Sequence, residues 1–305
     1  MKVSVFIPTY NAMSICGDVF TANLSILQSY PFYRRLIIDS SSLDNTLEIA
    51  KQYNFENRVI KNEEFDHGAT RELALEILED ADIIVYLTQD VLLANSDSIV
   101  NLINIFETNN KVSGCFGRQL PHNNADLLAK HLRLFNYSPL SYTRNYSDRY
   151  VFGIRCVFSS DSFAAYRVDI LRNIGGFPDR IIFGEDSFIF AKMLEAGYEV
   201  AYVAEAICYH SHNYSIKDEF KRYFDIGVFH RSQNWIIQSF GHANKEGLKF
   251  VLSEWKFLLL RAPWLLPKSI IKTVIKYLGY KLGYNYDIIG VRLCRKFTTN
   301  KSFWW

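Results

Sequence analysis

Residues 83–90 read Ile83-Ile84-Val85-Tyr86-Leu87-Thr88-Gln89-Asp90, a short apolar run that ends abruptly in three polar residues. An apolar run of this length, bounded by polar residues, predicts a buried strand of an α/β sheet. Ligands bind outside the carboxyl ends of the strands in open α/β sheets, and Asp90 would lie at that edge. Asp90 could hold a divalent cation against a phosphate, or it could cap the following helix. This stretch alone leaves both explanations open.

Strand and helix patterns alternate around this stretch through residues 1–120, as a wound α/β sheet requires. We expect strands at 3–7, 35–38, 58–60 and 83–87, with helices between them. Residues 120–165 are rich in Asn, Tyr and Ser, which predicts loops that shape a substrate cleft. Regular structure is expected again after residue 168: a helix over 187–196, strands at 199–203 and 206–210, and a helix capped by Ser215.

Composition and length narrow the class of protein. The chain has 305 residues, of which 49% are hydrophobic, so it can bury a sizeable core. Its five cysteines are scattered and odd in number, which excludes a disulfide framework and indicates reduced thiols. The N-terminus reaches Pro8 after a very short apolar run, so we expect a first strand and no signal peptide. No stretch approaches the roughly 18 apolar residues of a membrane span, so we expect a cytoplasmic protein.

Polar clusters lie at the predicted carboxyl ends of several strands. They are Thr9 with Asn11, Asp39 with Ser41, the segment from His67 to Arg71, and Thr88 to Asp90. These ends lie along one edge of a parallel sheet, so the clusters should converge on one crevice. Asp39 could accept a hydrogen bond from a base or ribose, and Arg71 near a helix N-terminus could meet a phosphate. A nucleoside diphosphate is the simplest ligand for this edge.

The motifs resemble those of the nucleotide-sugar glycosyltransferases of family 2, which have the GT-A fold. The resemblance covers residues 3–230 and rests on Pro8-Thr9-Tyr10-Asn11, Asp39-Ser40-Ser41-Ser42, Gly175-Gly176-Phe177 and Glu185-Asp186. The metal-binding Asp-X-Asp motif of the family is Thr88-Gln89-Asp90 in this chain. Together with Phe65-Asp66-His67-Gly68-Ala69-Thr70-Arg71, this variant resembles the bacterial rhamnosyltransferases of O-antigen and polysaccharide assembly.

The resemblance implies roles for individual residues. It places Asp90 as a ligand of Mg²⁺ or Mn²⁺ on the diphosphate, because oxygen-rich ligation suits these hard ions. Thr88 replaces the first aspartate of the motif and leaves one fewer strong ligand. A histidine could supply another ligand, and His212 is preferred to His210, which could also be a core histidine. The residues implied in nucleotide-sugar binding are Thr9, Asn11, Asp39, Ser41, His67, Arg71, Gln89 and Arg222.

Asp186 is the candidate general base. Inverting transfer requires a carboxylate that takes the proton of the acceptor hydroxyl as its oxygen attacks the anomeric carbon. The alternative is that Glu185 and Asp186 only cap the following helix. Their position after Gly175-Gly176-Phe177-Pro178 and beside a nucleotide edge favours catalysis, with Glu185 helping to orient the acceptor.

The resemblance also implies the organisation of the chain. We expect an α/β, Rossmann-like GT-A domain over residues 1–240, with a mostly parallel central sheet flanked by helices. Its nucleotide-sugar half would cover about residues 1–120 and its acceptor half about residues 121–240. Residues 241–305 would form a helical extension.

The extension is basic, with twelve Lys or Arg from Lys245 onward against three acidic residues. From Pro267 the sequence predicts an amphipathic helix with lysines at positions 268, 272 and 276. This pattern is typical of helices on anionic membrane surfaces, and aromatic residues near both its ends would suit the interface. The alternative is a helix that packs on the catalytic domain with its lysines in solvent.

The leading hypothesis is an inverting glycosyltransferase that uses dTDP-L-rhamnose and extends a polyprenol-diphosphate-linked saccharide. It would work in O-antigen (lipopolysaccharide) biosynthesis, bound peripherally at the inner face of the cytoplasmic membrane, with no nucleic-acid partner. A second enzyme hypothesis keeps the fold but uses a UDP-hexose donor. A third is a noncatalytic nucleotide-sugar-binding scaffold at the membrane, which the missing first aspartate makes conceivable and Asp186 argues against.

Overall fold

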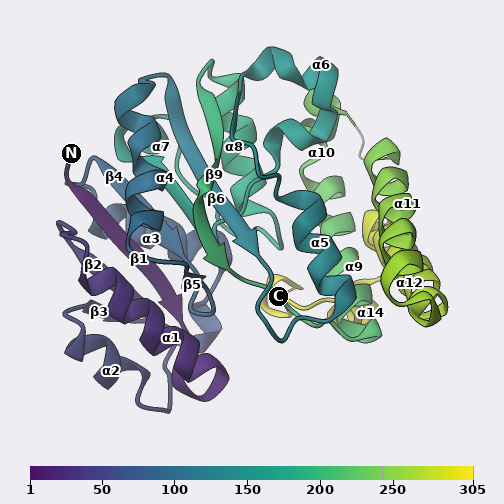
Figure 1. Cartoon of the computed structure of the whole chain (residues 1–305), viewed down its shortest axis with the longest axis horizontal. Helices are drawn as coiled ribbons and strands as arrows, with labels where there is room; N and C mark the ends of the chain where they lie inside the picture. Colours follow the sequence, from purple (N-terminus) through teal and green to yellow (C-terminus); the bar gives the residue numbers. More distant parts are fainter. Residues whose placement is uncertain (242–243, 305) are drawn as a thin grey trace.

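The computed structural model describes residues 1–241 and 244–304, and within these ranges the chain builds one nine-stranded sheet (Figure 1). The strand order is β3-β2-β1-β4-β8-β6-β9-β5, and β7 pairs with β9. The strands are β1 (Val3–Thr9), β2 (Arg35–Asp39), β3 (Glu56–Val59), β4 (Ile83–Leu87), β5 (Leu92–Leu93), β6 (Val112–Leu120), β7 (Tyr142–Arg144), β8 (Phe163–Arg167) and β9 (Glu199–Tyr209).

The sheet is mixed. Strands β3, β2, β1 and β4 are parallel neighbours, as predicted for the first half of the chain. Strand β8 is antiparallel to both β4 and β6, and β6 is parallel to β9. Strands β1, β2, β3, β4, β6 and β9 therefore all point in one direction. Their carboxyl ends share one edge of the sheet, which is where α/β sheets bind their ligands.

Helices cover both faces of the sheet (Figure 1). On one face lie α1 (Ala12–Gln28), α2 (Thr46–Gln52) and α4 (Asp97–Thr108). On the other lie α3 (His67–Ile77), α7 (Val168–Asn173), α8 (Glu185–Glu195), α9 (Ile216–Ser232), α10 (Asn234–Phe240) and α14 (Val291–Phe297). Every residue of β4 is buried, with Ile83, Val85 and Leu87 facing one core and Ile84 and Tyr86 the other. A strand buried on both faces has a continuous apolar sequence, which is why residues 83–87 could be predicted so closely.

The middle of the chain is more regular than its composition predicted. Within residues 120–165 the structure has α5 (Leu127–Asn136), α6 (Arg149–Phe152), two 3₁₀ turns (Tyr146–Asp148 and Gly153–Val157), and the strands β7 and β8. Helix α5 begins at Asp126, whose carboxylate accepts a hydrogen bond from the Ala129 N–H at 2.8 Å. The two strands expected over 199–210 form the single strand β9, which carries a register irregularity against β6.

The extension is helical, with α11 (Asn244–Arg261), a 3₁₀ turn (Pro263–Leu265), α12 (Leu266–Tyr284), α13 (Tyr286–Ile289), α14 and a last turn (Ser302–Trp304). Helices α11 and α12 lie at the end of the molecule opposite α1 and α2 (Figure 1). Helix α12 packs along α9, and its backbone approaches closely at Gly279 and Gly283. A Cβ at Gly279 would lie 2.5 Å from the Phe220 carbonyl oxygen, and a Cβ at Gly283 would overlap the Phe224 carbonyl oxygen.

The lysines of α12 are not arranged as the amphipathic pattern predicted. Lys272 is buried, and its Nζ lies 3.4 Å from Glu219 Oε1 on α9. Lys276 is largely covered and approaches the same carboxylate oxygen at 3.5 Å. The expectation that the lysines face a membrane or solvent is wrong for these two residues, because a carboxylate on α9 provides a partner inside the protein. In the described residues, no helix combines the length and the apolar character that a membrane span requires.

Replacing Gly283 with alanine should destabilise the protein, although alanine is the better helix former. The new methyl group would force α12 away from α9, and overpacking of this kind costs about 1–3 kcal/mol. Urea unfolding of Gly283→Ala would measure the loss. The matched control is Gly247→Ala on α11, where a Cβ meets no atom within 4 Å and stability should not fall. Equal stability of the two variants would contradict the close helix contact.

Candidate active site

The loops after β1 and β2 are joined around a buried carboxylate. Asp39 Oδ2 accepts hydrogen bonds from Thr9 Oγ1 at 2.7 Å and Ser42 Oγ at 2.6 Å. Its Oδ1 accepts one from the Ser42 N–H at 2.8 Å. Asp39 is fully buried, and its carboxylate holds the ends of β1 and β2 together through Thr9 and Ser42.

Asn11 and Gln89 extend this network. Asn11 has a left-handed backbone (φ 46°), its N–H donates to Ser42 Oγ at 2.7 Å, and its Oδ1 accepts from the Leu43 N–H at 2.8 Å. The Gln89 amide pairs with the backbone of Tyr10, accepting from its N–H at 2.8 Å and donating to its carbonyl oxygen at 3.2 Å. Gln89 therefore ties the end of β4 to the end of β1.

Ser41 completes the edge. It has a left-handed backbone (φ 61°), and its Oγ donates to the Ile60 carbonyl oxygen at 2.8 Å. Thr9, Asn11 and Asp39, the residues expected to meet the nucleoside, thus share one network at the ends of two neighbouring strands, and Ser41 lies beside it.

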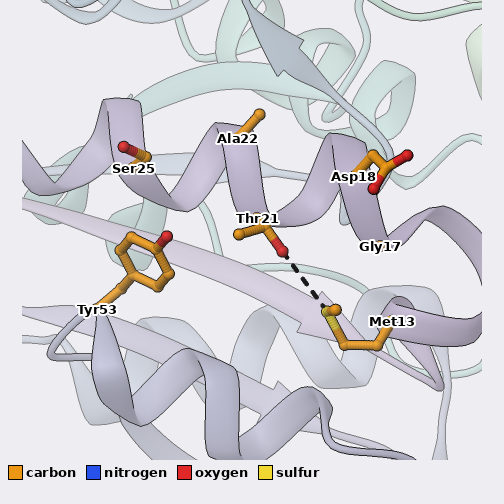
Figure 2. Close-up of a pocket in the computed structure, with 7 residues that line it drawn as sticks. All are labelled: Met13, Gly17, Asp18, Thr21, Ala22, Ser25 and Tyr53. Atoms are coloured by element: carbon orange, nitrogen blue, oxygen red, sulfur yellow. Dashed lines mark hydrogen bonds between the residues drawn. The ribbon is translucent and has the colours of Figure 1, made fainter.

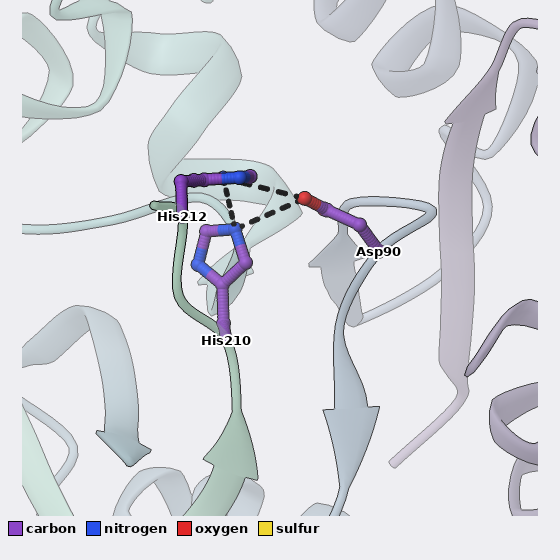
Figure 3. Close-up of side chains that lie close together, drawn as sticks. All are labelled: Asp90, His210 and His212. Carbon is purple, nitrogen blue, oxygen red and sulfur yellow. Dashed lines mark hydrogen bonds and ion pairs between the residues drawn. The ribbon is translucent and has the colours of Figure 1, made fainter. Parts of the chain in front are cut away.

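Asp90 meets two histidines from the far end of the chain (Figure 3). The reason is β5, which follows Asp90 directly and pairs Leu92 with Tyr209, the residue before His210. Asp90 Oδ2 lies 3.3 Å from His210 Nε2 and 3.4 Å from His212 Nε2, and the two nitrogens are 3.0 Å apart. One carboxylate oxygen of Asp90 and one ring nitrogen from each histidine all lie within 4.8 Å of one another, a spacing that suits the ligands of one ion.

The hydrogen bonds behind His210 decide which of its nitrogens is free. Arg133 donates to Gln119 Oε1 at 2.8 Å, so this oxygen is an acceptor. His210 Nδ1 lies 2.9 Å from the same oxygen and therefore carries the proton in the neutral ring. The lone pair of His210 Nε2 then faces Asp90 and His212. Fixing a ligand's tautomer through its second nitrogen is typical of metal-binding histidines.

The ionisation states favour a cation at this point. Burial alone would raise the pKa of Asp90, but at the low pH where this carboxylate takes up a proton, His210 and His212 are protonated; their hydrogen bond and charges, with the hydrogen bond from Thr88, hold its pKa below the usual value. Burial lowers the pKa of His210, and burial together with the nearby His210 lowers the pKa of His212 to about 4. At neutral pH the cluster is one carboxylate and two neutral imidazoles. Two imidazole nitrogens and one carboxylate oxygen can hold a divalent transition-metal cation and leave coordination positions for phosphate oxygens.

A second ionisable cluster surrounds Arg71. This buried guanidinium lies 2.8 Å from Asp161 Oδ2 through Nε and 3.1 Å from Glu185 Oε1 through a terminal nitrogen. Tyr166 donates to the other oxygen of Asp161 at 2.5 Å. The guanidinium is ion-paired inside the protein, and the two carboxylates compensate for the desolvation of its charge.

Asp186 follows Glu185 in the first turn of α8. The N-cap position is Gly184, with a left-handed backbone (φ 76°), so neither acidic side chain takes the capping role that was the alternative. Asp186 Oδ1 accepts from the Ser187 N–H at 2.6 Å. Burial raises the pKa of Asp186 to about 8, and the charges of Glu185 and Asp161 add to the effect. A carboxylate with such a pKa is a strong base for its type, as proton abstraction near neutral pH requires.

Arg222, on α9, stands near both clusters. Its guanidinium lies over the ring of Phe183, at 4.9 Å, and over the ring of Tyr214, at 5.7 Å. Phe183 leads into the turn that carries Glu185, and the Tyr214 ring is 5.2 Å from the His212 ring. The charge of Arg222 is felt by both Glu185 and His212. Arg222 is therefore the cation that links the acidic cluster to the histidine cluster.

His67 is at the edge of this arrangement. It is the first residue of α3, which Asp66 caps by accepting hydrogen bonds from the N–H groups of Gly68 and Ala69. Its Nδ1 is 3.9 Å from Glu185 Oε1, and its side chain is about half exposed.

Three residues of the site were not predicted. Gln119 and Arg133 hold His210, and Asp161 holds Arg71. Gln119 is a polar residue at the end of β6 and could have been noticed had that strand been predicted. Asp161 lies in a segment that was read as loop, so its sequence context gave no signal.

The structure also has a surface hollow of about 600 Å³ between α1 and α2 (Figure 2). Its lining includes Met13, Asp18, Thr21 and Tyr53, and Thr21 Oγ1 donates to Met13 Sδ at 3.7 Å. None of the predicted site residues lines it. The clusters at the strand ends, and not this hollow, carry the groups able to do chemistry.

Comparison with known proteins agrees with this geometry. The model of the family described as "Glycosyl transferase family 2" matches residues 4–175, which is more than half of the chain. The chain belongs to this family, whose enzymes transfer sugars with inversion.

Particular relatives are similar over nearly their whole length. The chain is 45% identical over 305 residues to the O-antigen chain rhamnosyltransferase RfbN of Salmonella typhimurium, covering 100% of this chain and 96% of the relative. It is 42% identical over 301 residues to the O-antigen chain rhamnosyltransferase WbaN of Salmonella anatum, covering 99% and 95%.

Solved structures share the fold at low sequence identity. The mannosyltransferase PcManGT of Pyrobaculum calidifontis, solved with GDP-Man and Mn²⁺, is 16% identical with a TM-score of 0.62, covering 94% of this chain and 88% of that one. TarS 1–349 of S. aureus with UDP-GlcNAc is 15% identical with a TM-score of 0.52, covering 94% and 91%. The predicted GT-A fold is therefore confirmed.

The raised pKa of Asp186 predicts how stability depends on pH. Between its ordinary value of 3.8 and about 8, the folded protein keeps a proton on Asp186 that the unfolded chain releases, so stability falls as pH rises through this window. Asp186→Asn removes this contribution. Relative to the wild type, the variant should gain at least about 1.4 kcal/mol between pH 5 and pH 8.5, the free energy of one pKa unit. Denaturant unfolding at both pH values measures it, and a constant difference would contradict the shift.

Proposed function

We propose that this glycosyltransferase is a metal-dependent rhamnosyltransferase that moves L-rhamnose from dTDP-L-rhamnose to a polyprenol-diphosphate-linked saccharide in O-antigen assembly. The observation that carries the proposal is the pair of clusters joined by Arg222, one suited to a cation and one holding a carboxylate of raised pKa. The sugar and the pathway are supported by the 45% and 42% identity to O-antigen chain rhamnosyltransferases.

The donor would lie along the edge formed by the ends of β1, β2 and β4. We assign the nucleoside to the network of Thr9, Asn11 and Asp39 and to the neighbouring Ser41, with Gln89 tying the end of β4 to the end of β1. Because Arg71 is buried and ion-paired with Asp161 and Glu185, we assign the direct diphosphate contact to Arg222. Arg71 and His67 would instead set the charge and position of Glu185.

Asp90, His210 and His212 would hold the divalent cation, Mn²⁺ or Mg²⁺. When bound, such an ion supplies positive charge beside the leaving diphosphate. The extra histidine compensates for Thr88, which stands where the family pattern has its first aspartate. Thr88 Oγ1 donates to Asp90 Oδ1 at 2.7 Å and leaves Oδ2 directed at the histidines.

Asp186 would act as the general base. The acceptor hydroxyl oxygen attacks the anomeric carbon, its proton passes to the Asp186 carboxylate, and the bond from that carbon to the diphosphate oxygen breaks. Attack from the side opposite the leaving group inverts the anomeric configuration. Glu185, charged and held by Arg71, would orient the acceptor next to the base.

The proposal predicts a specific pattern of activity. Wild-type protein with Mn²⁺ should release dTDP from dTDP-L-rhamnose in the presence of a lipid-linked saccharide acceptor, with a rate that rises from pH 6 to pH 9 as Asp186 loses its proton. Asp186→Asn should lower kcat at least about 100-fold, as loss of a general base does, while donor binding persists. Asp90→Ala should raise the KM for the donor.

Asp18→Asn, on the exposed side of α1, is the matched control and should retain full activity. A panel of UDP-hexoses separates the two enzyme hypotheses, since faster turnover with one of them would replace dTDP-L-rhamnose. Donor binding without turnover, with several lipid-linked acceptors, would indicate a noncatalytic binding protein. Full activity of Asp186→Asn would refute its role as base.

We further propose that the protein binds an anionic membrane surface through its C-terminal helices. With Lys272 and Lys276 of α12 turned inward, apolar side chains of α11, α12 and the turn between them remain 46% to 74% exposed. This exposed apolar face consists of Leu248, Leu252, Leu259, Leu260, Trp264, Ile270, Ile271, Val274, Tyr277 and Leu278.

The charges around the exposed apolar face favour anionic lipid as its partner. Between residues 247 and 286 the sequence has one acidic residue, Glu254, which is buried and accepts a hydrogen bond from Ser269. The exposed charged residues of α11 and α12 there are Lys249, Lys256, Arg261, Lys268 and Lys281. Apolar side chains with a basic surround are typical of helices in a bilayer interface, and each lysine or arginine near an anionic surface adds about 1 kcal/mol.

Val274→Asp should weaken binding to vesicles of phosphatidylglycerol and phosphatidylethanolamine about tenfold, because it removes about 1.4 kcal/mol of apolar burial. Sedimentation with the vesicles measures the bound fraction. Val100→Asp on α4 is the matched control, since the two valines are 51% and 49% exposed in helices at different ends of the molecule. Equal binding of the two variants, or no binding of the wild type, would overturn the membrane proposal.

A further inference from the structure

The segment that carries the second histidine of the cation cluster has little regular structure of its own. Residues 211–215 lie between the end of β9 and the start of α9. His212 is in this segment, and its ring packs against that of Tyr214 with 5.2 Å between centroids. The orientation of His212 therefore depends on what holds the backbone around it.

A lysine from α12 holds this segment. Lys272 Nζ donates to the Tyr214 carbonyl oxygen at 2.6 Å, across 58 residues of sequence. Lys272 is 4% exposed, and its charge is balanced by Glu219 at 3.4 Å. A buried ammonium group is costly unless it is paired and hydrogen-bonded, so an apolar residue would pack here more easily. Unlike an apolar residue, Lys272 can donate a charged hydrogen bond to the Tyr214 carbonyl oxygen.

The position of Lys272 relative to α9 is fixed by close helix packing. Gly279 and Gly283, two and three turns further on, bring α12 against the backbone of α9 with no room for a Cβ. Glu219 and Tyr214 belong to α9 and to the segment just before it. One rigid helix pair therefore presents the ammonium group to the Tyr214 carbonyl.

The same residues surround one small cavity. Its lining includes His212, Tyr214, Glu219, Lys272 and Lys276. His212 of the cation cluster and Lys272 of α12 thus line the same cavity, although they lie far apart in the sequence. The sequence did not predict this contact, because its lysine pattern indicated a helix with these lysines at a membrane surface or in solvent.

We propose that Lys272 is a positioning residue of the cation site, which holds His212 in its ligating orientation by binding the Tyr214 carbonyl. The inference rests on the proposed role of Asp90, His210 and His212 as ligands. It makes the C-terminal helices part of the site, in addition to any role at the membrane. Groups that orient metal ligands typically change metal affinity 10- to 100-fold when removed.

The test is the dissociation constant of Mn²⁺ alone, measured on the full chain by electron paramagnetic resonance of the free ion, well below the unfolding temperature. Lys272→Met keeps the length of the side chain and removes the ammonium group, and should weaken Mn²⁺ binding about tenfold. In transfer assays it should raise the Mn²⁺ concentration for half-maximal rate while kcat at saturating Mn²⁺ stays near that of the wild type.

Lys276→Met is the matched control, because Lys276 approaches the same Glu219 oxygen, at 3.5 Å, while the hydrogen bond to Tyr214 comes from Lys272. It should lower thermal stability but leave Mn²⁺ affinity unchanged. Lys272→Arg keeps a charged donor, and its Mn²⁺ affinity should fall between those of Lys272→Met and the wild type.

The outcomes separate this inference from the proposed function. Wild-type affinity in Lys272→Met, or equal weakening in Lys272→Met and Lys276→Met, would overturn the positioning role while the cation site stands. If Asp90→Ala binds Mn²⁺ as well as the wild type does, the cation site itself is wrong and the inference falls with it.

Discussion

The side chains of Asp90, His210 and His212 meet at the edge of the sheet, and this convergence is the constraint on which the rest of the site depends. A carboxylate oxygen of Asp90 and the unprotonated Nε2 of His210 would repel each other without a positive charge nearby. The protein nevertheless holds them together, through the pairing of β5 with β9 and through Gln119 behind the imidazole. A proton on His212 Nε2 relieves this repulsion when no ion is bound, and a divalent cation would be shared by all three side chains.

The neighbouring cluster uses the opposite arrangement. Here one buried guanidinium serves three carboxyl groups, which are too many for all of them to be charged in a buried environment. Glu185 keeps its charge beside Arg71, whereas Asp186 is driven toward its protonated form. One set of side chains thus contains an ionised carboxylate and a carboxyl group with high proton affinity. The Arg71 cluster and the histidine cluster differ in electrostatics as well as in position.

The sequence predicted the fold best where a strand is buried on both faces of the sheet. Strand β4 is buried on both faces, so its apolar run marked it and also located Asp90 at its end. The joining of Thr9, Asn11 and Asp39 followed from the direction of parallel strands, which needs no knowledge of side-chain contacts. Residue roles and donor chemistry, by contrast, came from family resemblance.

Long-range partners could not be read from the sequence. Asp161 pairs with Arg71 because β8 is inserted antiparallel between β4 and β6, and nothing local indicates that insertion. Lys272 and Lys276 have the spacing of a solvent-facing stripe, but a single carboxylate on α9 reverses which side of α12 is buried. Periodicity predicts that a helix has two faces, but the choice between them depends on its partner.

The close contact between α9 and α12 limits which segments of two related enzymes can be joined in a chimera. Phe220 and Phe224 offer their backbone carbonyls to α12 at a spacing that only glycine accommodates. A chimera that joined residues 1–240 of one relative to the last helices of another would set two mismatched helix surfaces against each other at that spacing. It would also exchange the lysine that reaches the Tyr214 carbonyl. Donor and acceptor preferences are therefore best transplanted by exchanging loops at the strand ends, with both helices kept from one parent.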